Sequence, residues 1–112
     1  MVSTNCQHQK SINHIRNKPT IMIRLNVFIT VSSENRAKYL EIAKELVAAS
    51  QKDAGCIAYD IFESSTRPEV LMICETWTDD EALAKHEAAD HFTTLVPKLA
   101  EIGQMKIERF EF

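Results

Sequence analysis

Apolar and polar residues alternate along four stretches of the chain, residues 22–31, 56–63, 70–77 and 105–112. A two-residue period is typical of β-strands, because successive side chains point to opposite faces. Residues 34–52 and 79–89 instead place apolar side chains three and four positions apart, which predicts helices that bury one face each. A further short helix is expected from His91 to about Val96, after an Asp90 cap and before a kink or restart at Pro97.

Capping residues and a stripe of buried positions define the two main helices. Ser32 or Ser33 is expected to cap the first helix, and Gly55 follows its end. Thr78 and Glu81 have the spacing of a capping box for the second helix. The buried stripe of the first helix is expected to comprise Ala37, Leu40, Ala43, Leu46, Val47 and Ser50, and that of the second Ala82, Leu83 and His86.

The order β-α-β-β-α-β predicts an α+β, ferredoxin-like antiparallel sheet with helices on one face. The first strand carries one apolar row, Ile23, Leu25, Val27, Ile29 and Val31, and one mixed row, Arg24, Asn26, Phe28 and Thr30. We expect the mixed row to line a pocket under the helices. The apolar row is expected on the open face, where a second copy of the chain covers it in a symmetric homodimer.

The third strand brings candidate chemistry to one place. Glu75 and Trp77 share a row with Leu71 and Ile73, so one carboxylate lies among apolar side chains. A buried carboxylate must be paired, hydrated or protonated. His86 follows on the inner stripe of the next helix. The sequence therefore predicts that a carboxylate, an indole and an imidazole meet.

Length, charge and cysteines set limits on the function. The 112 residues predict one domain, and a formal net charge of −3 argues against nucleic acid as a partner. No apolar run is long enough for a membrane span. Cys6, Cys56 and Cys74 fit neither a disulfide framework nor a zinc site, which favours free thiols and a cytoplasmic location.

Residues 1–21 show neither period and contain no acidic residue. We interpret them as a flexible N-terminal extension, or as sequence upstream of a natural start at Met22, with the folded domain at residues 22–112. His8 and His14 in this extension have no further ligand at a matching spacing, so no metal site is expected.

Four short motifs give residues 22–112 a resemblance to the antibiotic biosynthesis monooxygenase family, the dimeric α+β barrel group that includes quinol monooxygenases. They are Gly55–Tyr59, Glu75–Trp77, Ala82–His86 and Asp90–Phe92. The resemblance implies a monooxygenase that uses dioxygen and no cofactor on a quinol or small polyphenol. Family members also include an isomerase of a phosphorylated autoinducer and distant heme-degrading enzymes. Val96 stands where the latter carry their heme-ligating histidine, which argues against heme binding.

For a monooxygenase of this kind, His86 or Glu75 is expected to be the catalytic base, and Asn26 is expected to stabilise the charged intermediate. Trp77, Phe28, Tyr59 and Phe92 form the walls of the substrate site. Structural roles remain open for the same residues: a core position for Trp77, a hydrogen-bonded core position for His86, and an ion pair of Glu75 with Arg24 or Arg109. A non-catalytic module that binds a small ligand is the second class of function, and the isomerase is the third.

Overall fold

The elements follow one another in the order that the sequence predicts. In this computed structural model, which describes residues 21–112, they are β1 (Ile23–Val31), α2 (Arg36–Ser50), β2 (Cys56–Glu63), β3 (Val70–Trp77), α3 (Asp80–Glu87), α4 (Asp90–Ile102) and β4 (Gly103–Glu111). The strands form one antiparallel sheet with the order β2-β3-β1-β4. The ferredoxin-like α+β fold is therefore confirmed. Residues 1–20, nearly all of the predicted extension, lie outside the described residues.

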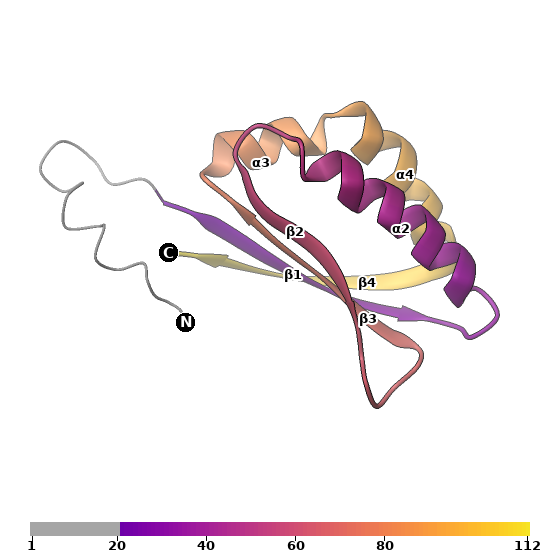
Figure 1. Cartoon of the computed structure of the whole chain (residues 1–112). Coiled ribbons are helices and arrows are strands. Elements are labelled where there is room, and N and C mark those ends of the chain that lie inside the picture. The colour runs from indigo at the N-terminus through magenta and orange to yellow at the C-terminus, as the bar shows by residue number, and fades with distance from the viewer. Residues whose placement is uncertain (1–20) are drawn as a thin grey trace, which may run out of the picture.

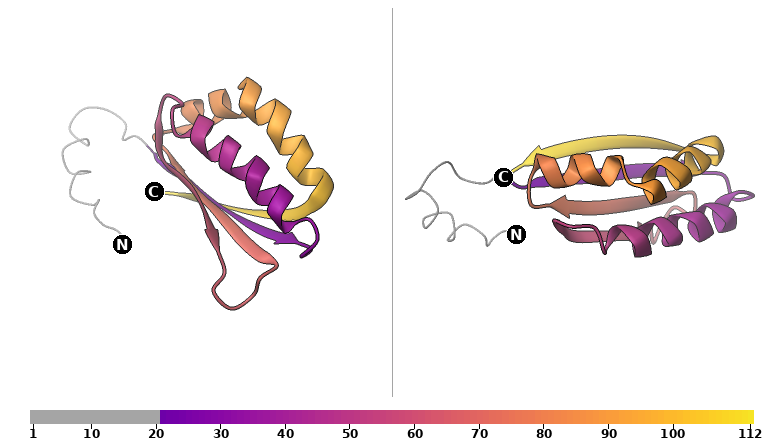
Figure 2. Two further views of the ribbon diagram at one scale, coloured as in Figure 1. Left: turned by 45° about the vertical axis from the view of Figure 1, so that its right-hand side comes forward. Right: turned by 90° about the horizontal axis from the view of Figure 1, so that it is seen from above.

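All three described helices cover the same face of the sheet (Figure 1). Helices α2 and α4 pack side by side, α2 over β2 and α4 over β4, while α3 contacts β3 (Figure 2). The opposite face of the sheet carries none of the helices formed by residues 21–112. Among residues 21–112, no helix is long and apolar enough to cross a membrane.

The two rows of β1 face the opposite way from the prediction. The apolar row is 1–8% exposed because it packs beneath the helices, and the mixed row lies on the open face. Residues paired across an antiparallel ladder point to the same side. Leu25 pairs with Glu75, whereas Asn26 pairs with Cys74. The expectation that the apolar row covers a partner sheet was therefore wrong.

The start of α2 and its buried stripe also differ from the prediction. Asn35, not Ser32 or Ser33, precedes the helix, and its side chain makes no capping hydrogen bond. Ser32 instead accepts the Asn35 N–H in the turn before it. The helix is rotated so that Ala37 is exposed, and its buried residues are Tyr39, Ile42, Ala43, Leu46, Val47 and Ser50.

The second helical region contains two smaller corrections. Asp79, rather than Thr78, caps α3, because its carboxylate accepts the Ala82 N–H at 2.8 Å. Helix α4 continues through Pro97 to Ile102 without a restart. The predicted inner stripe of α3 is confirmed, since Ala82, Leu83 and His86 are its buried residues.

Gly55 allows the turn after α2 to lie against α3. Its φ of +83° is in the left-handed region, and a Cβ there would lie 2.4 Å from the Cβ of Ala82. The Thr78 N–H donates to the Gly55 carbonyl at 2.9 Å, which ties this turn to the end of β3. The close approach brings Asp53 to the same end of the domain as His86.

Candidate active site

A buried hydrogen bond connects two residues at the end of β3. Trp77 is fully buried and Glu75 is 5% exposed, because both point from β3 toward the helices. The indole Nε1–H of Trp77 donates to Oε1 of Glu75 at 2.9 Å. Tyr59, on the neighbouring strand β2, pairs with Glu75 in the ladder and is also buried. This hydrogen bond and these rings form the floor of the site.

Aromatic rings surround the imidazole of His86, which α3 places above the floor. The His86 ring lies over Trp77, with ring centroids 4.5 Å apart and planes 32° apart. Phe92 meets it edge-on from α4 at 5.2 Å, and Tyr59 lies 5.4 Å away. Only 1% of His86 is exposed, so this packing fixes the position of the ring.

A second polar group reaches His86 from the turn after α2. Oδ2 of Asp53 lies 2.8 Å from Nδ1 of His86 and 2.8 Å from Nε2 of His91, the second residue of α4. One carboxylate oxygen thus joins two imidazoles from two helices. The side chains of Asp53 and His91 are 20% and 21% exposed, so the cluster reaches the surface at this end.

The contact with Asp53 determines which nitrogen of His86 carries the proton. An ionised carboxylate only accepts hydrogen bonds. The Nδ1–H group of a neutral His86 therefore donates a hydrogen bond to Asp53, and the proton stays on Nδ1. Nε2 then carries a lone pair, and this atom is buried without a hydrogen-bond partner among residues 21–112. Such an imidazole presents one proton-accepting atom to the interior of the site.

Burial changes the proton affinities of the site. Burial raises the pKa of Glu75 from 4.5 to about 7; the Trp77 N–H partly opposes this, and the Glu87 carboxylate adds to it. Burial also lowers the pKa of His86, and the Asp53 carboxylate partly opposes this. The lowered pKa favours the neutral imidazole near pH 7. The pKa of Tyr59 is raised, first by burial and then by nearby Glu75. A carboxyl whose pKa lies near neutrality and an imidazole whose neutral form is favoured therefore share one buried site.

The structure brings together Glu75, Trp77, His86, Tyr59 and Phe92, and it separates Asn26 and Phe28 from them. Asn26 and Phe28 were wrongly expected beside them, because both belong to the row of β1 on the open face. Asn26 Oδ1 lies 3.6 Å from the Cys74 thiol there. An ion pair of Glu75 with Arg24 or Arg109 is also wrong. Arg24 bonds to the Thr76 hydroxyl, and Arg109 pairs with Asp80 and Glu111.

Two members of the cluster were missed by the sequence analysis. The sequence indicated no chemical role for Asp53, and it placed His91 only at the start of a short helix after Asp90. They lie 38 residues apart in the sequence, and no local period connects them. The one available signal was Gly55, since a glycine two residues after Asp53 indicates a tight turn that can pack closely on another element.

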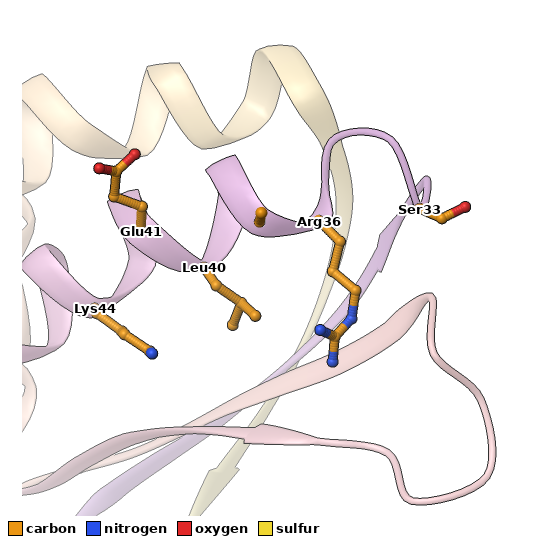
Figure 3. Close-up of a pocket in the computed structure, with 6 residues that line it drawn as sticks. Ser33, Arg36, Leu40, Glu41 and Lys44 are labelled. Atoms are coloured by element: carbon orange, nitrogen blue, oxygen red, sulfur yellow. The ribbon is translucent and has the colours of Figure 1, made fainter.

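A groove of about 640 Å³ lies elsewhere, along the outer side of α2 (Figure 3). Figure 3 shows Arg36 and Leu40 pointing from α2 toward the β2–β3 hairpin. Arg36 pairs there with Glu63 and donates to the Pro68 carbonyl. The remaining lining residues are Ser33, Ala37, Glu41 and Lys44. None of these residues belongs to the buried cluster, so the two features are distinct.

Fold and site together define a ferredoxin-like α+β domain with a cluster of titratable and aromatic side chains between sheet and helices. The chain belongs to the antibiotic biosynthesis monooxygenase family, which matches residues 22–98. The resemblance found in the sequence is therefore confirmed.

Three relatives extend this comparison. A conserved protein of unknown function from Bacteroides thetaiotaomicron, described as a possible oxidoreductase, is 57% identical, with a TM-score of 0.81 over 83% of this chain and 99% of that chain. "Putative monooxygenase YcnE" of Bacillus subtilis is 33% identical over 72% of this chain and 85% of its own length. An isomerase of (4S)-4-hydroxy-5-phosphonooxypentane-2,3-dione from Salmonella paratyphi B is 25% identical over 65% of this chain and 76% of its own length.

Proposed function

We propose that this protein is a monooxygenase that needs no cofactor and oxidises a quinol or small polyphenol with dioxygen. The observation that carries the proposal is the bare Nε2 of His86, buried among aromatic rings and oriented by Asp53. A neutral imidazole in such a position removes a phenolic proton near neutral pH. Membership of the monooxygenase family supports the type of reaction.

The reaction balances without an external reductant. Deprotonation by His86 gives a phenolate, which is electron-rich and passes one electron to dioxygen. The two radicals combine at a ring carbon to give a hydroperoxide, which loses water and leaves a carbonyl. One oxygen atom enters the product and the other leaves as water, whose hydrogens come from the substrate's C–H and O–H groups. A quinol thereby becomes a hydroxyquinone.

The other residues of the cluster have supporting roles in this proposal. Asp53 holds the His86 ring and its tautomer. Glu75, protonated or ionised near neutral pH, holds a substrate hydroxyl or serves as the second base. Trp77, Tyr59 and Phe92 pack against the substrate ring. Asn26 and Phe28 lie on the other face of the sheet and take no part within the same chain.

Oxygen uptake with a panel of hydroquinones tests the proposal. His86→Ala should lower turnover by roughly 10²–10⁴-fold, the usual contribution of a general base. Glu81→Gln, an exposed change on the same helix, is the matched control and should retain activity. With ¹⁸O₂, one labelled atom should enter each product molecule. Ligand binding without oxygen uptake by any quinol would contradict the monooxygenase and favour a binding module.

The isomerase is the second candidate, because a relative at 25% identity carries that name. An isomerase also moves protons with an acid and a base, so His86 and Glu75 suit both reactions. The two functions differ in their use of dioxygen. Conversion of the phosphorylated dione under nitrogen, with no oxygen uptake by quinols, would establish the isomerase instead.

The open face of the sheet supports a homodimer. It carries Phe28, Phe62 and Phe110, which are 39%, 50% and 47% exposed. Large apolar side chains gathered on one face of a small domain are typical of an interface. We therefore retain the predicted homodimer through the open face, with the mixed row of β1 in contact instead of the apolar row.

A further inference from the structure

Asp53, His86 and His91 place three metal-ligating atoms together. These atoms, Oδ2 of Asp53, Nδ1 of His86 and Nε2 of His91, all lie within 4.8 Å of one another. Both nitrogens are 2.8 Å from the oxygen. Ligands bound to Zn²⁺ at about 2.0–2.2 Å in a tetrahedral site lie about 3.3 Å apart. To hold a cation, the two short distances would lengthen by well under 1 Å, and the two nitrogens, no more than 4.8 Å apart, would approach each other.

The surroundings of these three atoms favour the binding of a cation. The two imidazoles are the partners of Asp53, and no Lys or Arg within residues 21–112 forms an ion pair with it. Its charge is thus free of a permanent counter-ion in that part of the chain. His86 is fixed by Trp77 and Phe92, so little ordering is needed for binding. The partial exposure of Asp53 and His91 gives a cation access from solvent.

We propose that Asp53, His86 and His91 form a binding site for a first-row divalent cation, with Zn²⁺ the best match. Two imidazoles and one carboxylate are a donor set that zinc and its neighbours prefer, whereas Mg²⁺ and Ca²⁺ prefer oxygen ligands. Three protein ligands leave a coordination position for water.

The bound cation would compete with the proposed reaction. Without a cation, Nδ1 of His86 carries the ring proton. A cation bound to Nδ1 displaces that proton to Nε2, the atom that would accept the substrate's proton. The site is therefore inhibitory, and this consequence rests on the proposed function, whereas cation binding itself does not.

Titration of the full-length chain with Zn²⁺ by calorimetry, and with Co²⁺ by visible absorption, tests the site without any substrate. Cys6, His8 and His14 should first be replaced by Ser, Ala and Ala, so that no thiol or imidazole of the N-terminal residues binds the probe. In this parent, one cation should bind per chain. His91→Ala should weaken binding by about 100-fold or more, because one of three ligands is lost. Glu81→Gln, exposed on the same helix, is the control and should bind like the parent.

Asp53→Asn provides a second variant in case His91→Ala does not fold, since the amide keeps the size of the side chain and removes its charge. It should also lose most of the binding, while circular dichroism verifies that the fold is retained. Absence of binding in the parent, or equal binding by a folded His91→Ala or Asp53→Asn variant, would overturn the site. If quinol turnover exists, Zn²⁺ should abolish it in the parent and spare any activity left in His91→Ala. Turnover unaffected by bound Zn²⁺ would refute the inhibitory role.

Discussion

Replacement of Glu75 by Gln should make the protein's stability much less dependent on pH. The Glu75 carboxyl has a pKa raised from 4.5 to about 7 by burial in the folded state. Below pH 4.5 it is protonated in both the folded and the unfolded chain and has no effect. Between the two pKa values the unfolded chain releases its proton first, so the free energy of unfolding falls as pH rises. Above pH 7 the full loss is present.

The size of this loss follows from the change in proton affinity. A difference between 4.5 and about 7, at about 1.4 kcal/mol for each tenfold change in affinity, corresponds to about 3 kcal/mol. Gln has nearly the same shape, and its carbonyl oxygen still accepts the Trp77 N–H. The advantage of the variant over the parent in unfolding free energy should therefore grow by about 3 kcal/mol between pH 4 and pH 8.

Urea unfolding followed by circular dichroism and by fluorescence of Trp77, the chain's only tryptophan, measures this difference. The chain concentration must be the same throughout, because the stability of a dimer depends on it. Glu45→Gln, on the exposed face of α2, is the matched control and should show no such growth. A constant difference between Glu75→Gln and the parent across this pH range would refute the reasoning. Glu75 would then be ionised at little cost, satisfied by its polar neighbours.

Three further perturbations test the fold and the assembly. Gly55→Ala should lower the free energy of unfolding by at least about 1 kcal/mol, because the positive φ and the contact with Ala82 both oppose a side chain; an unchanged urea midpoint would contradict this. Phe62→Asp on the open face should halve the mass of the assembly measured by light scattering, and a variant that keeps the dimer mass would contradict the interface. Val27→Asp, beneath the helices, should instead unfold the chain. Deletion of residues 1–21 should leave the melting temperature nearly unchanged, and a fall of many degrees would show that they contact the domain.

The strands and the fold were readable from the sequence because alternation is local. Each of the four strands was predicted within a few residues, and the order of elements left few topologies. The same alternation divides β1 into two rows without saying which row a helix covers. Burial decides this: a small domain places its most apolar row, from Ile23 to Val31, in its own core. The stripe of α2 was predicted correctly at Ala43, Leu46, Val47 and Ser50. Its first half was wrong for a similar reason, since Tyr39 and Ile42 are as compatible with a spacing of three and four residues as Ala37 and Leu40.

Half of the candidate site was also local. Glu75 and Trp77 lie two residues apart on one strand, and His86 is a single polar residue on an apolar helical stripe. Asp53 joins them only through the packing of the turn after α2 against α3, which depends on three-dimensional contacts between distant segments. His91 differs again, because a position near the start of a helix is compatible with either exposure or burial until the neighbouring turn is placed.

The central position of β1 has a consequence for how the chain folds. β1 lies between β3 and β4, although it is the first strand of the domain. During synthesis it emerges long before either partner, and its second edge stays unpaired until β4 is made. Contacts between such distant segments slow folding. A chain truncated before β4 would leave that edge open, and an unpaired edge of alternating apolar residues is prone to aggregation.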